Sequence, residues 1–114
     1  MAIKGIGVDV VEHPKFGERL FTEKERARAF EPRKDIAAIA ARFAVKEAVS
    51  KALGTGIGSV GWKEIETTSA ESGAPVVTLY GKAAKRAELM GVTQIHVSIS
   101  HERSVAVAMI ILEG

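Results

Sequence analysis

Runs of alternating or near-continuous apolar residues recur along the chain, bounded by glycine, proline or polar turns, which is typical of β-strands. We predict strands over residues 3–11, 62–68, 75–80, 94–100 and 104–112. Ser72 and Gly73 indicate a hairpin turn between the second and third of these strands. The last run is almost entirely apolar, which predicts burial on both of its faces and suggests a sheet face or edge that is buried between subunits.

Helical spacing predicts helices over residues 23–30, 36–53 and 81–90. Thr22 and Glu25 have the spacing of a capping box at the start of the first helix. Asp35 is a suitable N-cap for the long second helix, and Gly54 is suited to the position just after its end. The apolar side of this long helix is marked by Ile36, Ile39, Phe43 and Val49.

These elements predict an α+β fold with a mostly antiparallel sheet and a long central helix. The chain has 114 residues, so we expect a single domain over residues 1–114. His13 and Pro14 are expected to end the first strand. A core of this size has a thin stability margin, which association with further copies would increase.

The composition limits the cellular compartments and the classes of binding partner that can be expected. The chain has no cysteine, which excludes disulfides and thiolate metal sites and fits a cytoplasmic protein. The N-terminus lacks a signal-peptide core, and the last apolar run is shorter than the roughly 20 residues that span a bilayer, so no membrane association is expected. A net charge of +2, with one Trp and one Tyr, argues against a nucleic-acid-binding domain.

Two acidic residues and a lysine are the first candidates for chemistry. Asp9 lies at or near the C-terminal end of the first apolar strand, and Glu47 and Lys51 lie four residues apart on one helix face. Taken separately, Asp9 is a solvated strand end, and the other two form an exposed ion pair worth roughly 0.3–0.5 kcal/mol. If the fold brings the two carboxylates together, they suit Mg²⁺, which prefers oxygen ligands and keeps waters beside substrate phosphates.

The glycines at positions 54, 56 and 58 follow a helix rather than precede one, so they do not form a phosphate-binding loop. In the strand over residues 94–100, even-numbered positions share one face and odd-numbered positions the other. His96 is interpreted as a structural or surface histidine, whereas His101 lies at a turn and can present its imidazole to a site. The spacing is not that of a zinc site, and no serine has the context of a hydrolase nucleophile.

The region before the long helix is basic, with interspersed glutamates. Its cations are Arg19, Lys24, Arg26, Arg28, Arg33 and Lys34. A solvated helix face explains this pattern, and an acidic protein partner or a phosphate-rich ligand is the functional alternative.

Three segments together resemble one family, the holo-[acyl-carrier-protein] synthases, which are 4′-phosphopantetheinyl transferases of the short trimeric type. They are GIGVDVVE at residues 5–12, RFAVKEAVSKALGTG at 42–56 and HVSISHE at 96–102. The resemblance implies Mg²⁺-dependent transfer of 4′-phosphopantetheine from coenzyme A to a serine of apo acyl carrier protein, with release of adenosine 3′,5′-bisphosphate. It also implies a homotrimer whose active sites lie between subunits.

By motif position, the resemblance implies that Asp9 and Glu47 hold the metal and, with Lys51 and His101, carry catalysis. His101 is expected at the pyrophosphate, Arg33 and Lys34 at the ribose 3′-phosphate, and the turn over residues 72–75 near the adenine. The residues expected to bind coenzyme A are Arg33, Lys34, Arg42, Lys51, Gly54, Gly73, Pro75 and His101. Those expected to dock the carrier protein are Arg19, Lys24, Arg26 and Arg28.

The chain departs from the family pattern at two places. It has fewer residues between Glu12 and Leu20, where Pro14 interrupts the helix that docks the carrier, and Ala74 stands where a lysine is usual. The alternative interpretation is a trimeric module that binds coenzyme A without turnover. The presence of both acids and Lys51 favours the enzyme, because a degenerate enzyme is expected to lose at least one of them.

Overall fold

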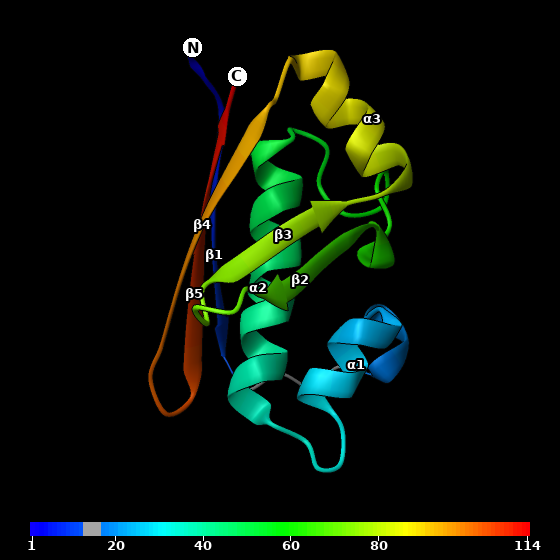
Figure 1. Cartoon of the computed structure of the whole chain (residues 1–114), viewed down its shortest axis with the longest axis vertical. Helices are drawn as coiled ribbons and strands as arrows, with labels where there is room; N and C mark the ends of the chain where they lie inside the picture. Colours follow the sequence, from blue (N-terminus) through cyan, green and yellow to red (C-terminus); the bar gives the residue numbers. More distant parts are fainter. Residues whose placement is uncertain (13–16) are drawn as a thin grey trace.

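The computed structural model describes residues 1–12 and 17–114 and arranges two antiparallel sheets around a long helix (Figure 1). The larger sheet has the strand order β1-β5-β4 and consists of β1 (Ile3–Glu12), β4 (Gln94–His101) and β5 (Val105–Glu113). The smaller sheet is a hairpin of β2 (Ile65–Ser69) and β3 (Pro75–Leu79). The helices are α1 (Glu23–Ala29), α2 (Ile36–Ala52) and α3 (Gly81–Met90). The predicted α+β architecture is confirmed.

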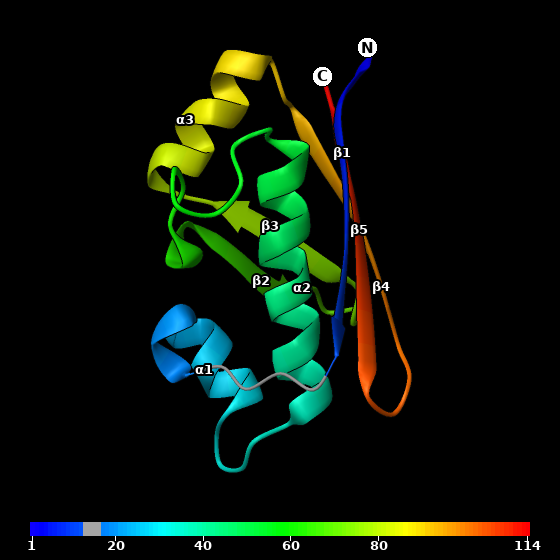
Figure 2. The same ribbon diagram turned by 180° about the vertical axis from the view of Figure 1, so that it is seen from behind.

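Helix α2 is the element that the rest of the chain surrounds. One side packs against the β1-β5-β4 sheet, the β2–β3 hairpin crosses it on another side, and α1 lies beside its N-terminal half (Figures 1 and 2). This placement explains why so much of α2 is buried, with Ala44, Ala48 and Val49 fully so. Among the described residues, no helix has the length and apolar character needed to cross a bilayer.

Two glycines of β1 let this strand lie directly against α2. A Cβ atom at Gly7 would overlap the carbonyl oxygen of Ala48, and one at Gly5 would overlap that of Ala52. Alternate residues of a strand share a face, so Asp9 points to the same side as Gly7. The GIGVD segment therefore places the Asp9 carboxylate against the surface of α2.

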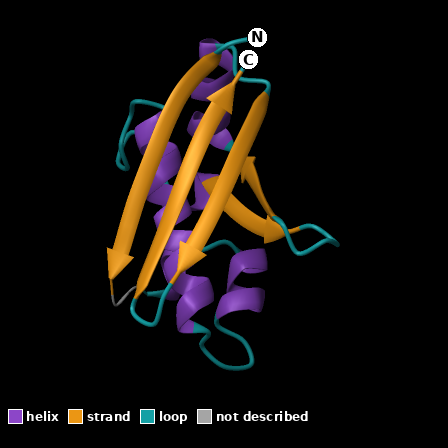
Figure 3. Cartoon of the chain, turned by 90° about the vertical axis from the view of Figure 1, so that its left-hand side faces the viewer, coloured by secondary structure: helices purple, strands orange, loops and turns teal. Residues whose placement is uncertain are grey.

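No other described element covers the outer face of the larger sheet, as Figure 3 shows. The inner face of β5 is fully buried through Ala106, Ala108, Ile110 and Leu112. On the outer face the side chains stay exposed, at 62% for Ile6, 52% for Val8 and 45% for Met109. The prediction that the last strand is buried on both faces is therefore wrong for the single chain, and the apolar outer face requires another explanation.

The predicted helix ends are confirmed by their caps. The Thr22 hydroxyl accepts from the Glu25 N–H, and the Glu25 carboxylate accepts from the Thr22 N–H. Asp35 caps α2 by accepting from the Ala38 N–H at 3.1 Å. Gly54 follows α2 with a φ of 75°, a left-handed conformation that glycine adopts without steric cost.

Three details differ from the sequence predictions. Residues Trp62–Glu64 form a 3₁₀ turn, so the strand predicted from residue 62 begins at Ile65. Ile36, expected on the apolar side of α2, is 54% exposed because it lies in the first turn, beyond the end of the core. His101 is the last residue of β4 rather than part of the connection. The expected break at His13 and Pro14 lies outside the described residues.

Candidate active site

A cluster of two acids and a lysine forms where β1 lies against α2. The Lys51 ammonium lies 3.0 Å from Asp9 Oδ1 and donates to the Val8 carbonyl at 3.0 Å. Glu47, one turn before Lys51 on α2, is close enough for the charge of Asp9 to act on it. Partial burial raises the pKa of Glu47, Asp9 raises it further, and Lys51 lowers it. We call Asp9, Glu47 and Lys51 the Asp9 cluster.

The Asp9 cluster joins residues that are far apart in the sequence, as the sequence-based hypothesis of a metal site requires. The predicted exposed pair of Glu47 with Lys51 is replaced by a pair of Lys51 with Asp9, whose side chain is only 15% exposed. Within residues 1–12 and 17–114, no three histidine, cysteine or acidic residues form a complete metal cage. Magnesium is commonly held by one or two carboxylates plus water and substrate phosphates, so the pair of acids fits this ion.

A second candidate region is a cavity of about 550 Å³ on another side of α2. Its floor includes the small residues Ala38 and Ala41 of α2, and the hairpin and the end of β4 form its walls. The polar and turn residues that line it are Arg28, Asp35, Arg42, Gly73, Pro75 and His101. We call this space the Arg42 cavity. It brings together Arg42, His101 and the turn over residues 72–75, which the sequence predicted to share a ligand.

Arg42 is a buried cation without a carboxylate partner among its hydrogen bonds. Its side chain is 7% exposed, one Nη donates to the Ala38 carbonyl at 3.3 Å, and Nε has no partner in the described structure. Burial lowers the pKa of the guanidinium, which Glu25 opposes. A buried charge is costly unless it is paired, so this arrangement favours an anionic ligand.

Next to the Arg42 cavity, the loop before α2 encloses a second space of about 560 Å³. Arg33 and Lys34 line it with Glu31 and Asp35, and both cations are exposed. Arg28 lines this space as well as the Arg42 cavity. The two hollows therefore share a basic side chain, as binding sites for one extended anion would.

The Asp9 cluster and the Arg42 cavity do not meet within one chain. Arg42 and Glu47 are five residues apart on α2, which separates them by about 140° around the helix axis. Glu47 faces the β1 side, whereas Arg42 faces the hairpin and the end of β4. A single chain thus presents two incomplete sets of candidate residues on different sides of one helix.

Comparison with known families identifies the family to which the chain belongs. Residues 5–109 match the family model described as ACPS, 4′-phosphopantetheinyl transferase superfamily. The chain belongs to this superfamily. It is a 4′-phosphopantetheinyl transferase, in agreement with the resemblance of its three sequence segments.

Individual relatives of the transferase agree over the full length. A holo-[acyl-carrier-protein] synthase of Natranaerobius thermophilus is 44% identical over 121 residues, covering 96% of this chain and 97% of the relative. The crystal structure of the Neisseria meningitidis holo-[acyl-carrier-protein] synthase superposes with a TM-score of 0.82 at 31% identity, covering 99% and 100% of the two chains. A Bacillus anthracis holo-(acyl-carrier-protein) synthase in complex with CoA (3′,5′-ADP) gives a TM-score of 0.78 at 37% identity, covering 96% of each chain.

The remaining candidates of the transferase lie outside both sets. Arg19 and Lys24 are exposed near and on α1, and Arg26 donates to the Phe21 carbonyl at 2.8 Å. Gly54 is exposed at the end of α2, beyond Lys51. His96, interpreted as a surface histidine, lies 2.9 Å from Glu113 on the outer face of the sheet.

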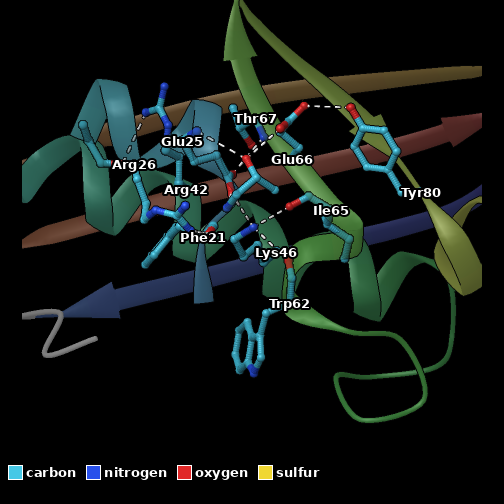
Figure 4. Close-up of polar contacts among 12 residues, drawn as sticks. Phe21, Glu25, Arg26, Arg42, Lys46, Trp62, Ile65, Glu66, Thr67 and Tyr80 are labelled. Atoms are coloured by element: carbon cyan, nitrogen blue, oxygen red, sulfur yellow. Dashed lines mark hydrogen bonds and ion pairs between the residues drawn. The ribbon is translucent and has the colours of Figure 1, made fainter. Parts of the chain in front are cut away.

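Glu25 and Lys46 form a buried ion pair that the sequence analysis did not predict (Figure 4). Both side chains are fully buried and their charged atoms lie 2.7 Å apart. The Lys46 ammonium also donates to the carbonyls of Trp62 and Ile65, and Glu25 accepts from the Thr67 N–H at 2.9 Å. Burial lowers the pKa of Lys46, and the charge of Glu25 opposes that shift.

The Glu25–Lys46 pair ties α1, α2 and β2 together, and these elements carry Arg28, Arg42 and the Thr67 side of the Arg42 cavity. Helical periodicity offered one signal for it. Lys46 lies four residues after Arg42 and three before Val49, so it shares their side of α2 rather than that of Lys51.

Proposed function

We propose that this transferase moves 4′-phosphopantetheine from coenzyme A to a serine hydroxyl of an apo acyl carrier protein. The convergence of Asp9 and Glu47 beside Lys51 is the observation that carries the proposal. The family supplies the reaction type, and the Bacillus anthracis relative in complex with CoA (3′,5′-ADP) supports coenzyme A as the donor. The second product in this proposal is adenosine 3′,5′-bisphosphate.

The Arg42 cavity and the adjoining basic loop would hold the nucleotide end of coenzyme A. Buried Arg42 would gain the anionic partner that it lacks, and Arg33 and Lys34 would meet the ribose 3′-phosphate. The turn at Gly73 and Pro75 would border the adenine, and Gly54 would let the ligand approach the backbone near Lys51. His101 would contact the pyrophosphate from the end of β4.

Asp9 and Glu47 would hold Mg²⁺, because two neighbouring carboxylates with Lys51 as their only close counter-charge in the described cluster favour a divalent cation. When bound, this ion supplies electrostatic stabilisation of charge on the pyrophosphate. Lys51 is a cation on the rim of the cluster, with its side chain 52% exposed. It can therefore turn from Asp9 to a phosphate oxygen.

In the transfer step the serine oxygen forms a bond to the phosphorus that carries pantetheine. The bond from that phosphorus to the bridging oxygen breaks, and the bisphosphate leaves with the electron pair. Lys51 stabilises or protonates the leaving phosphate. The serine gives up its proton during attack, and a carboxylate of the Asp9 cluster acting through water is one acceptor.

We propose a homotrimer, which the family resemblance implies, and the separation of the two residue sets supports active sites between its subunits. A site that needs both sets requires the Asp9 cluster of one chain and the Arg42 cavity of another. The uncovered apolar face of the larger sheet gives the chains a surface on which to associate (Figure 3). We propose that each chain contributes one domain, residues 1–114, to this assembly.

For the carrier protein we propose docking on the basic surface near α1, through Arg19, Lys24 and Arg26. These side chains lie on or just before α1, and carrier proteins recognised by cations must present acidic groups. Arg26 has fewer free N–H donors for a partner, because its Nη1 already donates to the Phe21 carbonyl.

The proposal is tested by mass spectrometry of the carrier. The protein is mixed with coenzyme A, Mg²⁺ and an apo acyl carrier protein, with chelator-treated and Glu47→Gln samples in parallel. We expect the pantetheinyl mass on the carrier only in the complete wild-type reaction. Binding of coenzyme A without transfer to any of several carriers would identify a binding module instead. Transfer that persists in chelator would contradict the metal requirement.

A further inference from the structure

We infer that Arg28 is a ligand for the nucleotide phosphates rather than a contact for the carrier protein. This inference rests on the proposed function and names a further binding residue in its site. It begins from the place of Arg28 at the C-terminal end of α1, where the side chain borders both the Arg42 cavity and the space beside Arg33 and Lys34. No other cation of the described chain lines both spaces.

The guanidinium of Arg28 is held at this border by Asp35. Its Nη1 lies 3.1 Å from Asp35 Oδ2, while the other carboxylate oxygen of Asp35 caps α2. Because the N-cap fixes Asp35 to the start of α2, the ion pair directs Arg28 along the mouth of the Arg42 cavity and away from the rest of the α1 surface. Lys24, on the same helix, lines neither space.

The Arg28–Asp35 pair is weak enough to exchange partners. Its side chains are 59% and 43% exposed, and pairs of this kind contribute about 0–1 kcal/mol to stability. A phosphate carries more charge than a carboxylate and accepts two guanidinium N–H groups at once. A nucleotide phosphate that reaches the cavity mouth can therefore take Arg28 from Asp35 at little cost, while Asp35 keeps its bond to the Ala38 N–H.

Buried Arg42 provides an independent reason to expect an anion at this place. Arg42 lines the same cavity and its buried Nε has no hydrogen-bond partner in the described structure, and the positive charge of Arg28 acts on the Arg42 guanidinium and lowers its pKa. Two neighbouring guanidinium groups repel one another unless an anion lies between them. The exposed arginine at the mouth and the buried one inside thus form two contacts for one phosphate-bearing ligand.

The test separates nucleotide binding from carrier binding. Calorimetry with adenosine 3′,5′-bisphosphate alone is expected to show roughly tenfold weaker binding for Arg28→Ala, the size of one lost charged hydrogen bond. Arg28→Lys should recover part of the affinity. In transfer assays the KM for coenzyme A should rise while the KM for the carrier stays within about twofold of wild type. Lys85→Ala, which removes an exposed cation from α3, controls for loss of charge alone.

Lys24→Ala provides the contrasting pattern, because it should raise the KM for the carrier and not that for coenzyme A. Wild-type nucleotide affinity in Arg28→Ala, or a rise confined to the carrier KM, would overturn the inference. If Arg28→Ala fails to fold, Arg28→Gln is measured in its place, with thermal unfolding as the check. If the wild type binds the bisphosphate but transfers nothing, the proposed function fails while the calorimetric comparison still tests Arg28.

Discussion

Glu47 is held where ionisation is less favourable than for an ordinary surface glutamate. Partial burial and the charge of Asp9 both raise its pKa, and Lys51 only partly offsets them. Two carboxylates kept close together repel one another, and a bound cation relieves that repulsion. If Asp9 and Glu47 hold a cation as proposed, the free protein is less stable than it would be without this repulsion, and shifted pKa values of this kind are common at functional sites.

We predict that Glu47→Gln loses most of the transfer activity and stabilises the free protein near neutral pH. Loss of one group that stabilises transition-state charge typically lowers the rate about 10²–10³-fold. The folded-state pKa of Glu47 is raised above its ordinary value of 4.5. Protonated Glu47 therefore favours the folded state at low pH, and this contribution to the free energy of unfolding is lost as the pH rises through the raised pKa.

Thermal unfolding of Glu47→Gln, without added metal or nucleotide, checks the stability half of this prediction. The midpoint should exceed that of wild type at neutral pH, and the two should converge as the pH falls well below the ordinary value of 4.5, where Glu47 becomes protonated in both states. A lower midpoint at neutral pH, or activity within a few-fold of wild type, would contradict the role given to Glu47.

Among the elements, α2 determines where both residue sets lie. On one side the glycines of β1 allow close contact with its backbone, and on another the Glu25–Lys46 pair fixes it to α1 and β2. Each contact fixes both the position of α2 and its rotation about the helix axis. Changes at either contact are therefore expected to affect the site and the stability together.

Gly7→Ala tests the contact between β1 and α2. The added Cβ would overlap the carbonyl oxygen of Ala48, and overpacking of this kind costs about 1–3 kcal/mol. Asp9 should move away from Glu47 as β1 shifts, so activity should fall as well. The matched control is Gly17→Ala, whose Cβ would meet no atom within 4 Å. Equal stabilities of the two variants in denaturant unfolding would show that the close approach is not required.

Lys46→Met tests the buried ion pair. It removes the ammonium and leaves Glu25 buried without its cation, for which the expected loss of unfolding free energy is about 3–5 kcal/mol. The same substitution at exposed Lys85 should change it by less than about 0.5 kcal/mol. Urea unfolding gives both values. A loss below about 1 kcal/mol for Lys46→Met would mean that the pair contributes little to holding α2.

At the scale of elements, much of the fold was predictable because its signals are local. The capping box at Thr22, the N-cap at Asp35 and the glycine after α2 specify the helix ends through contacts within a few residues. The 3₁₀ turn at Trp62–Glu64 and the Glu25–Lys46 pair were not predicted. The turn has a local signal that was missed, because the Glu64 carboxylate accepts from the Gly61 N–H as in a capping box. The Glu25–Lys46 pair depends on segments that meet only after the chain has folded, and a single sequence carries no direct record of such contacts.

For the whole molecule, the decisive feature is that one chain presents two incomplete sets. The meeting of Asp9 with Glu47 was expected from the family resemblance, since spacing along the chain does not show it. The separation of Glu47 from Arg42 could have been read from helical geometry, because five residues on a helix correspond to about 140° of rotation. The apolar run of β5 suggested a sheet face or edge buried between subunits, but it did not predict that the outer face is exposed in the single chain.

Complementation between two inactive variants tests the intersubunit site most directly. Glu47→Gln damages the Asp9 cluster, and Arg42→Met damages the Arg42 cavity while keeping its volume filled. The two variants are co-expressed with different tags, and trimers that carry both tags are isolated and assayed at limiting coenzyme A. Each variant alone is the control.

If each site combines the Asp9 cluster of one chain with the Arg42 cavity of its neighbour, every mixed cyclic trimer contains one intact site, and about a third of wild-type activity should return. If both sets served a site within one chain, no mixed trimer would contain an intact site. Activity no higher than that of the two variants measured separately would contradict the account.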